Sequence, residues 1–148
     1  CAMTVFGTLF QMVSAFLAVV AVGVLLYVPR KYLLYAGIVG ALGWLVDMAV
    51  REFAENPMLA AFFAAFLVAV LSQLFARLFK APVTVFLVSG ILPLVPGVGM
   101  YRMVYYLLKG EQSLSSYYFS YTLQIAGMIA LAIFVVDSFF KILYRKRK

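Results

Sequence analysis

The chain is built from long, almost uninterrupted runs of apolar residues. A transmembrane helix needs about 20 such residues to cross a bilayer core of about 30 Å, and five successive runs meet that requirement. They cover residues 5–28, 32–50, 58–79, 83–108 and 117–140. Only 11% of the residues are charged, against about 25% in soluble domains. The sequence therefore predicts an all-α, polytopic integral membrane bundle of five transmembrane helices, with residues 1–148 forming a single transmembrane domain in the lipid bilayer.

Composition excludes several classes of function. The chain has no His, and its one Cys is Cys1. His/Cys metal sites, Cys–His or Ser–His nucleophile pairs and a disulfide framework are therefore excluded, and we expect no cofactor. The net charge is +7, but five basic residues fall within the last eight positions. A basic run directly after an apolar segment is typical of a topology signal, so we expect no nucleic-acid partner.

The distribution of Lys and Arg predicts the orientation. Cytoplasmic loops of membrane proteins carry an excess of these residues. With five crossings, nine of the 12 basic residues fall on one side, and Arg51, Arg102 and Lys109 fall on the other. This places the N-terminus outside and the C-terminus in the cytoplasm, in a cell (inner) membrane. A fourth run that turned back without crossing would leave the basic tail outside, so the charge rule favours a full crossing.

The fourth run carries an unusual group of helix-breaking residues. It contains the segment Pro93-Leu94-Val95-Pro96-Gly97-Val98-Gly99. Each proline removes a backbone donor and disfavours helix in the residue before it, and glycine permits conformations closed to other residues. We therefore predict two half-helices, 83–92 and 98–108, with the helix broken at Pro93–Gly99. Such backbone is tolerated in a membrane only against protein or a water-filled cavity. Two interpretations of the break stay open: a proline kink that packs against neighbouring helices, and a ligand-binding site.

Stripes of small residues predict which helix faces are buried. Ala36, Gly40, Gly43 and Asp47 recur at helical spacing, and small residues let helices approach closely. This face directs Asp47 into the bundle, where Arg51 lies one turn later as an ion-pair partner. Similar stripes occur in the third and fifth runs. They are Ala61, Ala65, Ser72 and Ala76 in the third, and Ser120, Gln124 and Gly127 in the fifth.

Arg102 is the strongest candidate for solute binding. Ionisable groups inside a membrane are expensive and mark functional sites. Three occur in the runs: Asp47, Arg102 and Asp137. Asp137 has Lys141 one turn later and is interpreted as half of an ion pair at the cytoplasmic interface.

Arg102 would lie in the first turn of the second half-helix. The backbone N–H groups of Val98, Gly99 and Met100 would lack helical partners there. A half-helix N-terminus with an Arg suits a carboxylate, and Tyr101 and Gln124 offer neutral hydrogen bonds.

An enzyme fits the sequence poorly. An intramembrane aspartyl protease needs two carboxylates on one water, whereas Asp47 and Asp137 are predicted near opposite faces of the membrane. Its Gly-x-Gly-Asp signature is missing, because Met100 follows Gly99. A small multidrug antiporter needs an acidic residue in its first span, and residues 5–28 contain none. The remaining classes are a transporter subunit, a channel-like oligomer and a structural or assembly membrane subunit without its own transport site.

Three segments of the sequence resemble the threonine/serine exporter family. They are residues 27–30 (Tyr-Val-Pro-Arg), 36–44 (Ala-Gly-Ile-Val-Gly-Ala-Leu-Gly-Trp) and 93–101 (Pro-Leu-Val-Pro-Gly-Val-Gly-Met-Tyr). The resemblance is to the C-terminal membrane half of the family, which in many bacteria is a separate small subunit, and it spans roughly residues 20–148. It implies export of threonine and serine, or of dicarboxylates such as succinate.

The resemblance also implies a partner, the larger membrane subunit of the same exporter. Five crossings is an odd number, so two such units would have opposite orientations, as in transporters built from inverted repeats. We therefore expect assembly with that subunit or self-association.

Overall fold

The computed structural model describes residues 2–145, and the side chains of residues 6–144, as an all-helical chain. The predicted all-α class is confirmed. The elements in chain order are α1 (Ala2–Leu25), α2 (Arg30–Ala54), α3 (Pro57–Leu78), α4 (Val83–Ile91), the 3-10 helix η1 (Leu92–Leu94), α5 (Gly97–Leu108) and α6 (Gln112–Arg145). Cys1 and the basic residues 146–148 lie outside the described part.

Four helices are long and apolar enough to cross a membrane, namely α1, α2, α3 and α6. A fifth span is formed if α4 with η1 and α5 act as one broken crossing, and the two parts are bent by 51°. Helix α6 has 34 residues, which at 1.5 Å per residue is about 51 Å. It is therefore much longer than the predicted run 117–140 and longer than a bilayer core requires.

The helix ends follow from local sequence. Asn56 caps α3, because its Oδ1 accepts hydrogen bonds from the backbone N–H groups of Met58 at 3.0 Å and Leu59 at 3.5 Å. Pro57 occupies the first helical position, where its missing N–H costs nothing. Glu55, the residue before Asn56, has a left-handed backbone conformation with a φ of 49°, which ends α2. A two-residue turn therefore makes α2 and α3 an antiparallel pair.

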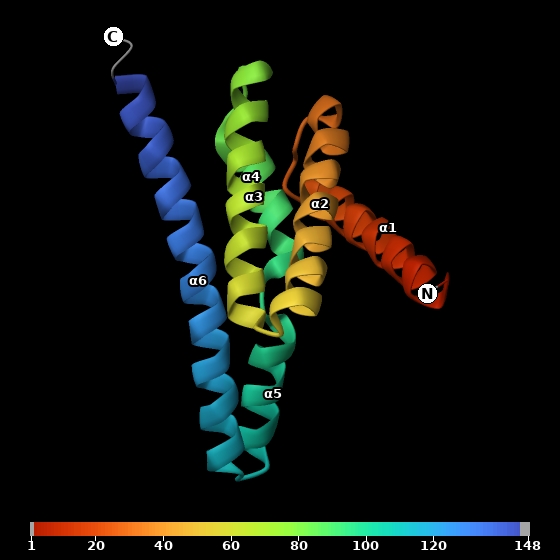
Figure 1. The fold of residues 1–148 in the computed structure, drawn as a ribbon, viewed down its shortest axis with the longest axis vertical. Coiled ribbons are helices and arrows are strands. Elements are labelled where there is room, and N and C mark those ends of the chain that lie inside the picture. Colours follow the sequence, from red (N-terminus) through yellow and green to blue (C-terminus); the bar gives the residue numbers. More distant parts are fainter. Residues whose placement is uncertain (1, 146–148) are drawn as a thin grey trace.

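Helices α2, α3 and α4 form the centre of the bundle, with α6 against α3 and α1 tilted against α2 (Figure 1). Among the described elements, α5 packs only against α6, and it lies beyond the α2–α3 turn (Figure 1). The α1–α2 and α3–α4 connections and the C-terminal end of α6 lie at one end of the bundle. The α5–α6 turn lies at the opposite end, the α2–α3 turn lies between the two ends, and the start of α1 lies to one side (Figure 1).

Small residues bring the central helices together, as predicted. The stripe of Ala36, Gly40, Gly43 and Asp47 is buried. A Cβ on Gly43 would collide with Val68 of α3, so this glycine is required for the close approach of α2 and α3. The third-run stripe is buried as well (Ala61, Ala65, Ser72 and Ala76).

The predicted inward stripe of the last run is wrong. Ser120, Gln124 and Gly127 are exposed, and the buried residues of α6 are instead Ser115, Ile125, Ile129, Ala132 and Val136. Large apolar side chains of α6 pack against the alanines of α3 in one core cluster. The small side chains that let α3 and α6 approach each other therefore come mainly from α3. The face that α6 turns inward carries large apolar residues together with Ser115 and Ala132.

Candidate functional site

The predicted break in the fourth run is present, and Pro96 produces it. Val95 has an extended backbone, with φ −61° and ψ 129°, which is the conformation that a following proline imposes. Pro93, by contrast, is accommodated inside η1, and Leu92 before it stays helical with φ −55° and ψ −41°. The non-helical segment is therefore limited to Val95 and Pro96, and α5 begins directly at Gly97.

Gly97 and Gly99 were predicted to permit an unusual backbone conformation, which the structure does not show. In the described part of the chain only Gly110 among the glycines has a positive φ, so Gly97 and Gly99 do not supply a special backbone conformation. A Cβ on Gly99 would collide with Oγ1 of Thr122 on α6, whereas a Cβ on Gly97 would meet no atom within 4 Å. Gly99 therefore permits the close contact of α5 with α6.

A cavity of about 410 Å³ lies at the break. It contains residues from α2, η1, α5 and α6. Its lining is Trp44, Arg51, Pro93, Leu94, Val95, Pro96, Gly97, Val98, Gly99, Arg102, Tyr118, Tyr121 and Ile125. Six of the nine predicted site residues are therefore brought together. Because Arg51 belongs to the last turns of α2, the break lies near the end of that helix and not at its middle.

Arg102 reaches this cavity with its charge uncompensated. Its Nη1 donates a hydrogen bond to the Tyr118 hydroxyl at 3.3 Å, and its guanidinium carbon lies 5.5 Å from the centre of the Tyr118 ring. Within residues 2–145, no carboxylate forms an ion pair with Arg102. A cation held by neutral groups at the wall of a cavity is suited to bind an anion.

Asp47 lies behind the cavity and not in its lining. Its Oδ2 forms an ion pair with Arg51 Nε at 2.8 Å, as predicted, and the Asp47 residue is only 2% exposed. Its other oxygen, Oδ1, has no hydrogen-bond partner among the described residues. Asp47 therefore acts on the cavity through Arg51, which it holds in place.

The first turn of α5 offers fewer free donors than predicted. The Met100 N–H donates to the Pro96 carbonyl at 3.2 Å, and the Gly97 N–H donates to the Val95 carbonyl at 2.7 Å. The prediction that Met100 is unpaired is therefore wrong. Val98 and Gly99 are first-turn residues that line the cavity, and at these positions the helix itself provides no acceptor.

Tyr101 and Gln124 lie away from the cavity. Tyr101 is 68% exposed, and its ring stacks on that of Tyr105 at 6.0 Å. Gln124 is on the exposed face of α6. Each residue is adjacent in sequence to a lining residue, Arg102 or Ile125, and one step along a helix rotates a side chain by about 100°.

The cavity also has an aromatic wall, which was not among the predicted site residues. Trp44, Tyr118 and Tyr121 line it, and the Trp44 indole N–H donates to Gln11 Oε1 at 3.3 Å. The signal for the tyrosines was available. Lys109–Glu111 is a three-residue turn between α5 and α6, and such a short turn places the start of the last helix beside Arg102.

The family described as Threonine/Serine exporter, ThrE, matches residues 11–139. The chain belongs to the threonine/serine exporter family. No curated protein and no solved structure matches the chain. The family is one of membrane transporters and not a class of enzymes, and the apolar helices agree with a multi-pass membrane protein. The match begins before the predicted start of the resemblance, and it ends before the basic tail.

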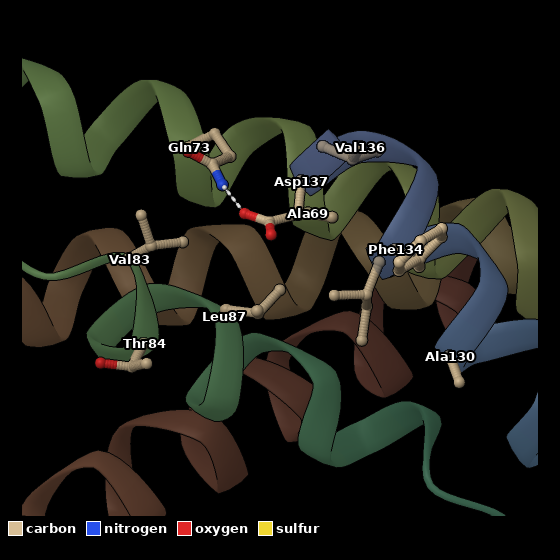
Figure 2. A pocket seen from close by; sticks show the side chains of 10 residues that line it. Ala69, Gln73, Val83, Thr84, Leu87, Ala130, Phe134, Val136 and Asp137 are labelled. Atoms are coloured by element: carbon tan, nitrogen blue, oxygen red, sulfur yellow. Dashed lines mark hydrogen bonds between the residues drawn. The ribbon is translucent and has the colours of Figure 1, made fainter. Parts of the chain in front are cut away.

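This exporter-family chain has a second cavity, of about 490 Å³, between α3, α4 and α6. It lies toward the end of the bundle that carries the α3–α4 connection. Its lining is mostly apolar apart from Gln73, Thr84 and Asp137 (Figure 2). Gln73 Nε2 donates a hydrogen bond to Asp137 Oδ1 at 3.2 Å. The predicted ion pair of Asp137 with Lys141 is confirmed, with Oδ2 to Nζ at 2.6 Å.

A groove between α4 and α6 joins the two cavities. Among the described residues, these helices have no Cα atoms within 8 Å of each other. A third cavity of about 260 Å³ lies between them, and all of its lining residues are apolar. It shares Leu87 and Ile133 with the cavity at Asp137 and Val95 with the cavity at the break. In this chain, polar groups therefore lie in the two cavities on either side of an apolar one, and neighbouring cavities share lining residues.

Proposed function

We propose that this chain is the small subunit of an exporter that moves small carboxylate-bearing solutes out of the cell. The solutes are threonine and serine, or dicarboxylates such as succinate. The observation that carries the proposal is Arg102, a cation without an acidic partner in the described chain, at the wall of the cavity beside the first turn of α5. We assign the chain no catalytic reaction.

The chemistry of the break cavity suits a carboxylate. The free N–H groups of a helix N-terminus stabilise an anion by up to about 2 kcal/mol in partly buried sites. The Arg102 guanidinium adds a full charge and two parallel donors that match the two oxygens of a carboxylate. Arg51 presents a second guanidinium to the same cavity. The aromatic wall of Trp44, Tyr118 and Tyr121 is suited to contact the apolar part of a solute.

The groove between α4 and α6 is proposed as the solute path, with a partner completing its open side. One wall is supplied by each helix, and α3 lies behind them at the Asp137 end. A second membrane unit, either the larger subunit of the exporter or another copy of this chain, would separate the path from lipid. Five crossings per unit suit an inverted pair.

The proposed membrane is the inner membrane, with the N-terminus outside and the C-terminus in the cytoplasm. The positive-inside rule supports this orientation. One end of the bundle carries most of the basic residues, in helix ends and in the α3–α4 connection: Arg30, Lys31, Arg77, Lys80 and Lys141. The other end carries Arg51, Arg102 and Lys109. The break cavity is then on the outer side, and the Asp137 cavity is on the cytoplasmic side.

The test is the Arg102→Gln variant in proteoliposomes that contain the chain with its partner subunit. Hydrogen bonds to a charged group contribute about 1.5–3 kcal/mol, so we expect KM for threonine, serine or succinate to rise about 10- to 100-fold. Arg102→Lys should recover only part of the loss, because an ammonium does not match the two-oxygen geometry. Lys109→Gln is the matched control, since it removes an exposed cation of the same helical hairpin outside the cavity lining.

Unchanged transport by Arg102→Gln would refute a carboxylate site at the break. Efflux that does not saturate with solute concentration, or an ion current, would instead favour a channel-like oligomer. A chain that assembles with its partner but adds nothing to efflux would be a structural or assembly subunit.

A further inference from the structure

We infer that the cavity at Asp137 is a second solute subsite, which binds the ammonium group of an amino acid and disfavours solutes that lack one. This inference rests on the proposed function, because it concerns the same path between α4 and α6. Tyr118, which holds Arg102, and Asp137 lie at the two ends of the groove on the same helix, about 28 Å apart at 1.5 Å per residue. One zwitterion therefore meets the two subsites in turn, with its ammonium recognised at Asp137 and its carboxylate at Arg102.

Asp137 is held at the cavity by groups from two helices. Its Oδ1 accepts the hydrogen bond from Gln73 of α3, and its Oδ2 pairs with Lys141 of α6. Figure 2 shows the Gln73 amide and the Asp137 carboxylate facing each other, with Leu87 of α4 on the other side of the cavity. The Asp137 side chain is 43% exposed. The carboxylate is therefore fixed in direction and still accessible from the cavity.

The orientation of Gln73 follows from a second contact. Gln73 is only 8% exposed, and its Oε1 accepts a hydrogen bond from Arg77 Nη2 at 3.5 Å. Arg77 is itself held by aromatic rings of α6, with its guanidinium carbon 3.4 Å from the centre of the Tyr144 ring. Because Arg can only donate, the amide oxygen must face Arg77 and the amide NH₂ must face Asp137.

A solute ammonium can take the place of Lys141. The Lys141 side chain is 76% exposed, so its ammonium can move into water or the headgroup region while its stem stays on the helix. An exposed pair of this kind has little net stability, and its loss opposes solute binding only weakly. A carboxylate accepts from several donors at once, so Asp137 can keep Gln73 while it receives an incoming N–H group.

The same carboxylate acts against anions. A dicarboxylate such as succinate would bring a second negative charge next to Asp137, and like charges in a partly buried site repel. The apolar lining between the two cavities contains no polar side chain that could compensate. The Asp137 cavity therefore favours threonine and serine over dicarboxylates and over monocarboxylates of the same shape.

The experiment compares threonine with 3-hydroxybutyrate, which has the same carbon skeleton and a hydrogen in place of the ammonium group. Both are measured as solutes, or as competitors for threonine, on the cytoplasmic face of inside-out vesicles containing the full chain and its partner. In Asp137→Asn we expect KM for threonine to rise about tenfold, the factor that corresponds to one modest charged hydrogen bond. The KM for 3-hydroxybutyrate should stay unchanged or fall, because Asp137→Asn removes a negative charge that repels this anion. Asp137→Glu should restore part of the preference for threonine.

Lys141→Gln keeps the test falsifiable if Asp137→Asn does not fold. It removes the competing ammonium and leaves Asp137 in place, so threonine should bind equally well or better. Equal losses for both solutes in Asp137→Asn, weaker threonine binding in Lys141→Gln, or a wild-type chain without preference for threonine would each overturn the inference. Failure of the proposed function is distinct, because the wild-type vesicles would then carry none of threonine, 3-hydroxybutyrate and succinate. Transport of succinate without threonine would overturn this inference and leave the proposed function standing.

Discussion

Gly99 allows a sharp test of how α5 packs on α6. A methyl group at this position would collide with Thr122 Oγ1, while the Thr122 Cβ would be at an ordinary contact distance of 3.6 Å. Gly97, two residues earlier in the same turn, has open space around it. Gly99→Ala and Gly97→Ala are therefore the same chemical change in two different environments.

The size of the effect follows from two opposing contributions. Overpacking a tight contact costs about 1–3 kcal/mol, while replacing glycine by alanine inside a helix gains up to about 1 kcal/mol. We expect Gly99→Ala to lower the free energy of unfolding by about 1–2 kcal/mol, and Gly97→Ala to leave it unchanged or slightly raised. Thr122→Ala should relieve the collision. Because Thr122 Oγ1 has no hydrogen-bond partner in the described part of the chain, that change removes no bond.

The assay is thermal unfolding of the full chain in lipid nanodiscs, with the double variant completing a mutant cycle. For a chain of this size, each 1 kcal/mol corresponds to a shift of about 2–4 °C in Tm. Gly99→Ala should therefore lower Tm by roughly 2–8 °C, and Gly99→Ala/Thr122→Ala should return close to the Tm of Thr122→Ala. Equal Tm values for the two alanine variants, or no recovery in the double variant, would refute this packing of α5 on α6.

Two further predictions concern the ion pair of buried Asp47 with half-exposed Arg51 and the topology. Arg51→Leu leaves the Asp47 carboxylate buried without a partner, so we expect a loss of about 3 kcal/mol in unfolding free energy. Most of it should be recovered in Asp47→Leu/Arg51→Leu, and an equal loss in both variants would contradict the pairing. Reporters fused after Gly110 and after Lys148 should report opposite sides of the membrane, with the second in the cytoplasm. The same side for both would mean that the segment from Val83 to Leu108 does not cross.

Most of the fold was predictable because it depends on local chemistry. Membrane helices are recognised by the length of an apolar run, and the ion pair of Asp137 with Lys141 lies one turn apart on a single helix. The break at Pro96 is also local, since a proline controls the conformation of the residue before it. The small-residue face of α2 was predictable for a related reason, because only small side chains permit the close approach seen between α2 and α3.

The site was predicted only in part, because several of its features depend on how one helix is rotated against another. A stripe at helical spacing defines a face but not the neighbour that the face meets, so Gln124 was placed inward although α6 turns that face outward. The bond between Gln73 and Asp137 joins residues 64 positions apart, and no local pattern encodes such a pairing.

The sequence by itself determined a helical membrane chain, the position of its break and the charges at its two ends. The tertiary structure alone decided that these charges lie at opposite ends of one apolar groove. The physical reason is that large side chains of α6 pack against the alanines of α3, which holds the α6 backbone against α3 and, among the described residues, more than 8 Å from the Cα atoms of α4. The space between α4 and α6 follows from that packing, and with it the groove that we propose as the solute path.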